Sequence, residues 1–129
     1  MRVYQAAEAG RARVHLVDDD RAVRDSLKFA LELEGLAVQT WESGNQLLSD
    51  GDLSAADCLV LDCKMPGLDG FALIAALAGR NVKVPIIMIT APVTDAVCRQ
   101  AVAAGVYCVL EKPLLDSILS DTVRRALAH

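Results

Sequence analysis

Four short segments carry the side chains that could do chemistry in this sequence, and each follows a run of apolar residues. They are Val17-Asp18-Asp19-Asp20, Leu61-Asp62-Cys63-Lys64-Met65-Pro66-Gly67, Ile89-Thr90-Ala91 and Glu111-Lys112-Pro113-Leu114. Together they supply carboxylates, a hydroxyl group and a lysine ammonium group. Oxygen ligands suit Mg²⁺, and a carboxylate beside a metal ion can attack phosphorus. The four segments therefore indicate a site that holds a divalent metal and carries a phosphoryl group on an aspartate.

The rest of the sequence predicts five strands that alternate with five helices, because short apolar runs are separated by segments with helical spacing. The predicted strands are 14–17, 36–41, 58–62, 84–90 and 106–110, and the predicted helices are 21–34, 43–49, 69–78, 94–104 and 114–127. Such alternation predicts an α/β fold, in which a parallel sheet carries helices on both faces. Ligands of such sheets bind at the carboxyl ends of the strands, where all four segments lie.

The acidic residues fall into two groups with different expected roles. Clustered carboxylates repel one another, and a bound Mg²⁺ gives Asp18 and Asp19 a reason to lie together. Asp20 and Asp69 are better placed to cap the helices that follow them. Taken alone, three acids before a helix are more often a cap than a metal site.

Asp62 ends the third strand and is the expected phosphoacceptor, although a strand-end acid often only shapes a turn. The loop after it contains Met65-Pro66-Gly67 and then Gly70. A tight loop of this kind can aim the backbone carbonyl of Lys64 back at the metal.

Thr90 and Lys112 end the fourth and fifth strands. The Thr90 hydroxyl is suited to donate a hydrogen bond to a phosphoryl oxygen, and the Lys112 ammonium group is suited to balance the acids. A lone strand-end threonine is usually structural, and a lysine before a helix is usually only solvated. Pro113 restricts Lys112 to an extended or turn conformation and is a favourable first residue for a helix.

The combined pattern resembles the receiver domain of bacterial response regulators, over roughly residues 12–127. The resemblance is carried by Asp18-Asp19, by Asp62 within Asp62-Cys63-Lys64-Met65-Pro66-Gly67-Leu68-Asp69-Gly70, by Thr90 and by Lys112-Pro113. It looks closest to nitrogen-fixation-type regulators with a helix-turn-helix output domain. It implies a doubly wound, five-stranded parallel sheet of flavodoxin-like order 2-1-3-4-5.

The resemblance also implies a mechanism. A histidine kinase would transfer its phosphoryl group to Asp62, with Mg²⁺ held by Asp18, Asp19, Asp62 and the Lys64 carbonyl. Thr90 and Lys112 would respond to the new charge. The helix over 94–104, the strand over 106–110 and the last helix would change their interactions, including homodimerisation, and so control transcription through an output domain outside this chain. An aromatic residue common in the family is replaced by Val109, and Tyr107 lies on the same side of the strand.

Two other interpretations are open. A haloacid-dehalogenase-like phosphatase would use Asp18 as its nucleophile, but Ala22 breaks that motif and no carboxylate pair follows Lys112 at a strand end. A pseudo-receiver would keep the fold without phosphorylation, but it usually lacks an acid, the threonine or the lysine. An enzyme is therefore not expected beyond self-phosphorylation and self-dephosphorylation.

Composition sets further bounds. The 129 residues are 53% hydrophobic and only 4% aromatic, which favours an aliphatic core in one domain, 13–128, after a tail, 1–12. The net charge of −4 and the lack of a basic run argue against nucleic-acid binding. Residues Cys58, Cys98 and Cys108 fall in apolar segments, so buried reduced thiols in a cytoplasmic protein are expected. No signal peptide or membrane span is recognisable.

Overall fold

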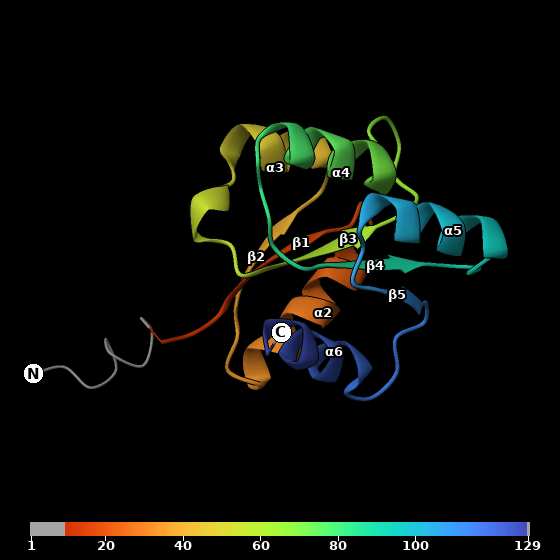
Figure 1. Ribbon diagram of the computed structural model, residues 1–129. Helices are drawn as coiled ribbons and strands as arrows, with labels where there is room; N and C mark the ends of the chain where they lie inside the picture. Colours follow the sequence, from red (N-terminus) through yellow and green to blue (C-terminus); the bar gives the residue numbers. More distant parts are fainter. Residues whose placement is uncertain (1–9, 129) are drawn as a thin grey trace, which may run out of the picture.

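The computed structural model describes residues 10–128 as one parallel sheet between two layers of helices (Figure 1). The strands are β1 (Arg13–Val17), β2 (Ala37–Trp41), β3 (Cys58–Asp62), β4 (Ile86–Thr90) and β5 (Cys108–Glu111). The helices are α2 (Arg21–Leu33), α3 (Gly44–Asp50), α4 (Gly70–Gly79), α5 (Asp95–Ala104) and α6 (Ile118–Leu127), with a 3₁₀ turn, η1 (Leu53–Ala55). The strand order β2-β1-β3-β4-β5 confirms the fold expected from the sequence.

Two apolar clusters hold the layers together, one on each face of the sheet. Alternate residues of a strand point to opposite faces, so β1 contributes Val14 and Leu16 to one cluster and Val17 to the other. The first cluster joins the sheet to α2 and α6, and the second joins it to α3 and α4. Figure 1 shows the same division, with α3, α4 and α5 above the sheet and α2 and α6 below it. Because both faces are covered, β3 and β4 are buried at every position.

The helix ends follow the local sequence signals. The Asp20 carboxylate accepts hydrogen bonds from the backbone N–H groups of Ala22 and Val23, and the Asp69 carboxylate accepts one from Ala72. Both predicted caps are thereby confirmed. These caps fix where the loops after β1 and β3 turn into helices, and both loops carry site residues.

Several predicted boundaries are wrong by a few residues. β4 begins at Ile86 rather than at residue 84, and β5 covers 108–111 rather than 106–110. The last helix begins at Ile118 instead of residue 114, because Asp116 has a φ of 54°, which a helix cannot accommodate. Leu115, which lies inside the predicted helix over 114–127, is outside the observed one and is 67% exposed.

The cysteine prediction is partly wrong. Cys58 and Cys63 are buried, Cys108 is half-buried and Cys98 is exposed, because the buried face of α5 is narrow and contains only Ala101. All four thiols are free, as expected. Within residues 10–128 no helix has the length and apolar character needed to span a membrane. Most of the predicted tail, residues 1–9, lies outside the described part of the chain.

Candidate functional site

The carboxyl ends of β1, β3 and β5 bring two aspartates and a lysine into direct contact. The Lys112 Nζ lies 2.8 Å from Asp18 Oδ2 and 3.1 Å from Asp62 Oδ2. The Asp18 side chain is completely buried, that of Asp62 is 5% exposed and that of Lys112 is 24% exposed. Residues 94 and 50 positions apart in the chain are thus joined because parallel strands end at the same edge.

Backbone groups complete the hydrogen bonding of both carboxylates. The N–H of Asp20 donates to Asp18 Oδ1 at 2.9 Å, and the N–H of Lys64 donates to Asp62 Oδ1 at 3.1 Å. Each carboxylate therefore has one oxygen held by its own loop and the other held by Lys112. This arrangement fixes the orientation of both side chains without any partner molecule.

Burial and like charge act on Asp62 in the same direction. Burial, followed by the negative charge of Asp18, raises the pKa of the Asp62 carboxyl, and the hydrogen bonds from Lys112 and Lys64 oppose that rise. Burial lowers the pKa of Lys112, but its hydrogen bonds to Asp18 and Asp62 outweigh this and the net pKa is raised. The ammonium group is therefore firmly protonated and its charge is shared by two carboxylates.

Three carboxylates form a set of oxygen atoms suited to a hard cation. One oxygen each from Asp18, Asp19 and Asp62 lies within 4.8 Å of the others, and Asp19 is the exposed member. Mg²⁺ is coordinated by one or two protein carboxylates together with water and phosphate oxygens, so this donor set fits it. The sequence predicted these three acids, and the structure brings them together.

Thr90 lies at the end of β4, one position beyond Ile89, the register partner of Asp62. The residue is 1% exposed, and its Oγ1 atom has no hydrogen-bond partner within the described residues. The Thr90 hydroxyl also faces the Cys63 sulfur, but sulfur is only a weak acceptor and does not replace an oxygen partner. Burial, in turn, raises the pKa of the Cys63 thiol, while the Thr90 hydroxyl opposes that rise. A buried hydroxyl without a partner is rare and calls for a ligand or a functional reason.

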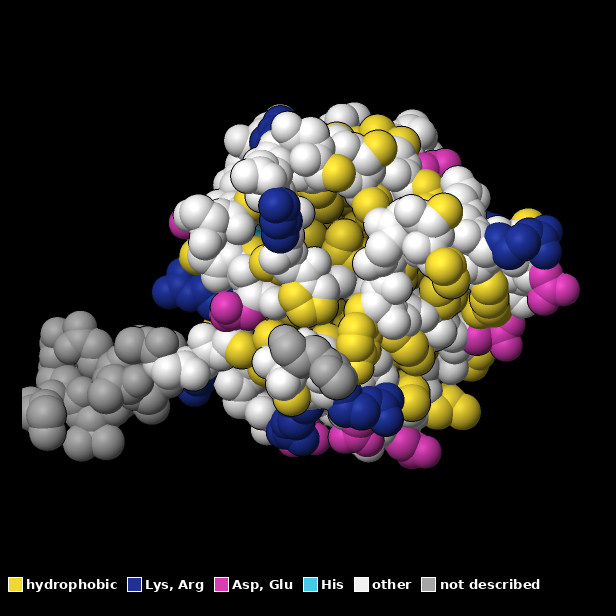
Figure 2. Space-filling model, in the orientation of Figure 1, with side chains coloured by type: hydrophobic (Ala, Val, Ile, Leu, Met, Phe, Trp, Pro, Cys, Tyr) yellow, Lys and Arg dark blue, Asp and Glu magenta, His cyan; other side chains and the backbone are white. Residues whose placement is uncertain are grey.

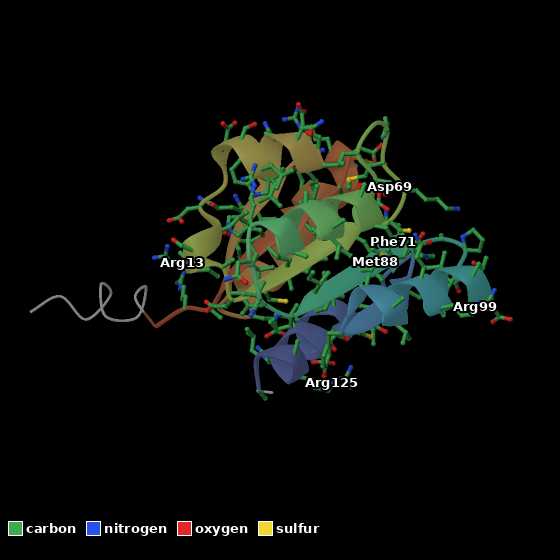
Figure 3. The ribbon with its side chains drawn as sticks, turned by 45° about the horizontal axis from the view of Figure 1, so that its top comes forward. Arg13, Asp69, Phe71, Met88, Arg99 and Arg125 are labelled. Atoms are coloured by element: carbon green, nitrogen blue, oxygen red, sulfur yellow. The ribbon has the colours of Figure 1, made fainter. Side chains whose placement is uncertain are left out.

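The loop between β3 and α4 needs a glycine at residue 70. A Cβ atom there would lie 2.7 Å from the backbone oxygen of Asp62 and 3.1 Å from the Met88 side chain. Figure 3 shows the start of α4, marked by Asp69 and Phe71, close to Met88 of β4. Gly67, in the same loop, has a φ of 74°. The tight loop expected from the sequence is present and packs directly against the backbone of Asp62.

Two side chains connect the β4–α5 loop to its neighbours. The Lys64 Nζ donates to the Ala91 carbonyl at 3.2 Å, and the Val93 N–H donates to Glu111 Oε2 at 2.8 Å. The sequence assigned neither contact, because both join residues far apart in the chain through loops. Lys64 thus extends across the space between the loops that follow Asp62 and Thr90.

Arg24 is a site residue that the sequence did not indicate. Helical spacing places it on the water-facing side of α2, yet it is half-buried and its Nη1 donates to the Asp18 carbonyl at 2.7 Å. The only available signal was its position one turn into the helix, six residues after Asp18. From there a long side chain can reach back to the end of β1.

Known proteins resemble this chain in both sequence and structure. The family model described as "Response regulator receiver domain" matches residues 14–124. The transcriptional regulatory protein TdiR of Thauera aromatica is 40% identical over 126 residues, which are 96% of this chain and 55% of that protein. The regulator DctR of Rhodobacter capsulatus is 36% identical over 117 residues, or 89% of this chain and 59% of that protein. The FixJ protein of Azorhizobium caulinodans is 37% identical over 116 residues, or 90% and 55%.

Solved structures agree with the observed fold. The FixJ-N crystal structure has a TM-score of 0.81 at 32% identity and covers 92% of this chain and 94% of that one. A response regulator receiver protein from Burkholderia phymatum has a TM-score of 0.80 at 36% identity, covering 92% and 96%. This chain spans little more than half the length of the three curated relatives named above.

Proposed function

The chain belongs to the response regulator receiver family of two-component signalling, and we propose that Asp62 is its phosphoacceptor. The phosphoryl donor is the phosphohistidine of a sensor kinase. An Asp62 carboxylate oxygen attacks phosphorus, the bond from phosphorus to the imidazole nitrogen breaks, and that nitrogen leaves with the electron pair. The product is a mixed anhydride on Asp62 and a free histidine on the kinase.

The unpartnered Thr90 hydroxyl is the observation that carries this proposal. It is buried at the end of the strand next to Asp62, where a phosphoryl oxygen would give it the acceptor it lacks. Lys112, already in contact with Asp62, would pair with a second phosphoryl oxygen. A phosphoryl group on Asp62 would thus contact the Thr90 hydroxyl at the end of β4 and the Lys112 ammonium group just after β5.

The acidic residues would hold the metal that this reaction needs. We assign Asp19, Asp62 and the Lys64 carbonyl as Mg²⁺ ligands, with Asp18 bound directly or through water. When bound, Mg²⁺ offsets the negative charge that accumulates as a phosphoryl group approaches three carboxylates. Asp18 also keeps Lys112 in place through its 2.8 Å contact.

Phosphorylation would act on α5, β5 and α6 through the β4–α5 loop. Movement of Thr90 toward the phosphoryl group would pull this loop, which is tied to β5 by Glu111 and Val93. Val109 stands where the family often has an aromatic residue. It is half-buried and packs against the apolar cluster that joins the sheet to α3 and α4. Because valine is smaller than an aromatic side chain, a rotation of Val109 on phosphorylation would move fewer atoms.

The same face is the proposed homodimer surface. Its exposed apolar residues include Val102 on α5 and Ile118 on α6, which are 80% and 39% exposed. Figure 2 shows hydrophobic side chains at the surface around α5 and the loop that leads to α6. On the face drawn there, lysine and arginine side chains are scattered.

We further propose residues 13–128 as the receiver unit, acting in the cytoplasm. Receiver domains are signalling domains and are not generally classed as enzymes, and turnover here would be limited to self-phosphorylation and self-dephosphorylation. The phosphatase alternative, with Asp18 as nucleophile, is disfavoured because the response regulator receiver model matches residues 14–124. The pseudo-receiver alternative is disfavoured because the acids, the threonine and the lysine are all present and meet at one edge of the sheet.

Incubation with acetyl phosphate and Mg²⁺, followed by intact mass measurement, tests this function. We expect one added phosphoryl group, which is absent from Asp62→Asn and suppressed by a chelator. Asp69→Asn is the matched control, since Asp69 caps α4 and should still permit phosphorylation. An unchanged wild-type mass at saturating donor would refute the proposal.

A further inference from the structure

Arg24 makes a charged hydrogen bond to the backbone of the acidic cluster. Its side-chain Nη1 donates to the Asp18 carbonyl at 2.7 Å, and its backbone N–H donates to the Asp20 carbonyl at 3.0 Å. The side chain is half-buried, so it is less screened by water than a surface arginine. Both contacts fall on the turn that joins β1 to α2, and this turn contains all three consecutive aspartates.

Asp19 depends on this turn for its position. Among the hydrogen bonds of residues 10–128, none involves the Asp19 carboxylate, although Asp18 and Asp20 each use theirs. Asp19 is exposed, yet one of its oxygens lies within 4.8 Å of oxygens from Asp18 and Asp62. Within the described residues, no hydrogen bond of its own holds this side chain, so the backbone of the turn is the restraint that remains.

The contact from Arg24 fixes the relevant piece of backbone. The Asp18 carbonyl and the Asp19 N–H belong to one planar peptide unit. A hydrogen bond that holds this carbonyl therefore also restrains the position of the Asp19 backbone nitrogen. On the other side, the Asp18 N–H donates to the Trp41 carbonyl at 3.2 Å. We propose that Arg24 is a positioning residue that aims Asp19 at the metal site. This inference rests on the proposed function, because it requires Mg²⁺ at the acidic cluster.

The sign of the effect separates positioning from simple electrostatics. A cation near a metal site repels the metal, so removing only its charge should tighten Mg²⁺ binding. Removing a group that orients a ligand should weaken binding instead, and loss of such a supporting contact typically costs about 10- to 100-fold in metal affinity. Arg24→Gln removes both the charge and the reach of the guanidinium, and the direction of the change tells which role dominates.

Arg21 provides a matched control on the same helix. It lies one turn before Asp25, its side chain is 86% exposed, and its Nε atom is 3.7 Å from Asp25 Oδ2. No described hydrogen bond joins it to the acidic cluster. Arg21→Gln therefore makes the same change of charge near the site without touching the Asp18 carbonyl.

Calorimetric titration with Mg²⁺, together with thermal unfolding in the absence of metal, provides the test. We expect Arg24→Gln to bind Mg²⁺ about tenfold more weakly than wild type, and Arg21→Gln to bind equally or slightly more tightly. Arg24→Lys keeps a cation with a shorter reach, so its affinity should fall between those of wild type and Arg24→Gln.

Wild-type or tighter binding by Arg24→Gln would overturn the assignment of Arg24. If Arg24→Gln does not fold, Arg24→Lys decides, and an affinity equal to wild type overturns the assignment. Failure of the wild-type protein to bind Mg²⁺ is a different result, because it would overturn the proposed metal site itself and this inference with it.

Discussion

Replacing Thr90 with valine should stabilise the unphosphorylated protein. The Thr90 hydroxyl is buried, with the residue 1% exposed, and its oxygen has no hydrogen-bond partner within the described residues. Leaving such a group unsatisfied costs about 1–3 kcal/mol. Valine has the same branched shape and suits a strand equally well, so the change removes the polar group with little effect on packing. We expect the free energy of unfolding to rise by about 1 kcal/mol, at the lower end of that range.

Thermal and urea unfolding of the metal-free protein measure this effect. For a domain of this size, 1 kcal/mol corresponds to an increase in Tm of about 3–5 °C. Thr122→Val is the matched control, because Thr122 is also buried but its hydroxyl donates to the Ile118 carbonyl at 2.7 Å and accepts from Arg125 at 3.1 Å. Loss of these hydrogen bonds should lower stability by about 1 kcal/mol or more. The two substitutions should therefore shift Tm in opposite directions.

A loss of stability in Thr90→Val comparable to that in Thr122→Val would refute the reasoning. It would mean that the Thr90 hydroxyl already has a partner in the resting protein. The phosphorylated protein provides a second comparison, because there the hydroxyl is expected to donate to a phosphoryl oxygen. Phosphorylation should then stabilise wild type more than Thr90→Val, and equal changes would argue against a role for Thr90.

Three further predictions concern the loop after β3, the ion pair of Lys112 and the buried histidine of β1. Gly70→Ala should lower stability by about 1–3 kcal/mol and reduce phosphorylation, because its Cβ would lie 2.7 Å from the Asp62 backbone oxygen. Gly79→Ala, where nothing lies within 4 Å, should instead stabilise α4 by about 0.5–1 kcal/mol in urea unfolding. Lys112→Met should raise the pKa of Asp62 further, because the hydrogen bond and the positive charge of Lys112 both lower that pKa. An unchanged Asp62 pKa in carboxyl NMR titration would contradict this prediction. Burial lowers the pKa of His15 from 6.5, so the unfolded chain binds a proton at this residue more readily than the folded protein does. The free energy of unfolding should therefore be highest above pH 6.5 and should fall as the pH drops from 6.5 through the lower pKa of the folded protein. Urea unfolding above pH 6.5 and at a more acidic pH should show this fall in the free energy of unfolding for wild type and not for His15→Gln.

The sequence predicted the strand ends of this site well and the contacts between loops poorly. Asp18 and Asp62 were placed correctly because buried apolar strands of 5 residues leave little freedom about where each strand ends. The order of the sheet then brings them to one edge. Lys112 also reaches this edge, since β5 ends at the residue before it, although the predicted bounds of that half-buried strand were wrong.

Other features depend on three-dimensional contacts that periodicity does not encode. Arg24 has the position of a solvent-facing residue on α2, yet its length allows it to reach the Asp18 carbonyl. The apolar residues Leu114 and Leu115 led to a predicted start of the last helix at residue 114. The left-handed conformation of Asp116 instead prevents a helix from including these residues. Cys98 was expected to be buried from its apolar neighbours, but the exposed side of α5 accepts small residues.

Chemical mapping of the phosphorylated residue tests the central claim most directly. Borohydride reduces an aspartyl phosphate to homoserine, and peptide mass spectrometry then locates the altered residue. After treatment with acetyl phosphate and Mg²⁺, we predict homoserine at position 62 alone, and none in the protein treated without phosphodonor. Homoserine at position 18 or 19 in place of 62, or at no aspartate in a protein that has gained a phosphoryl group, would contradict the assignment of Asp62 as the phosphoacceptor.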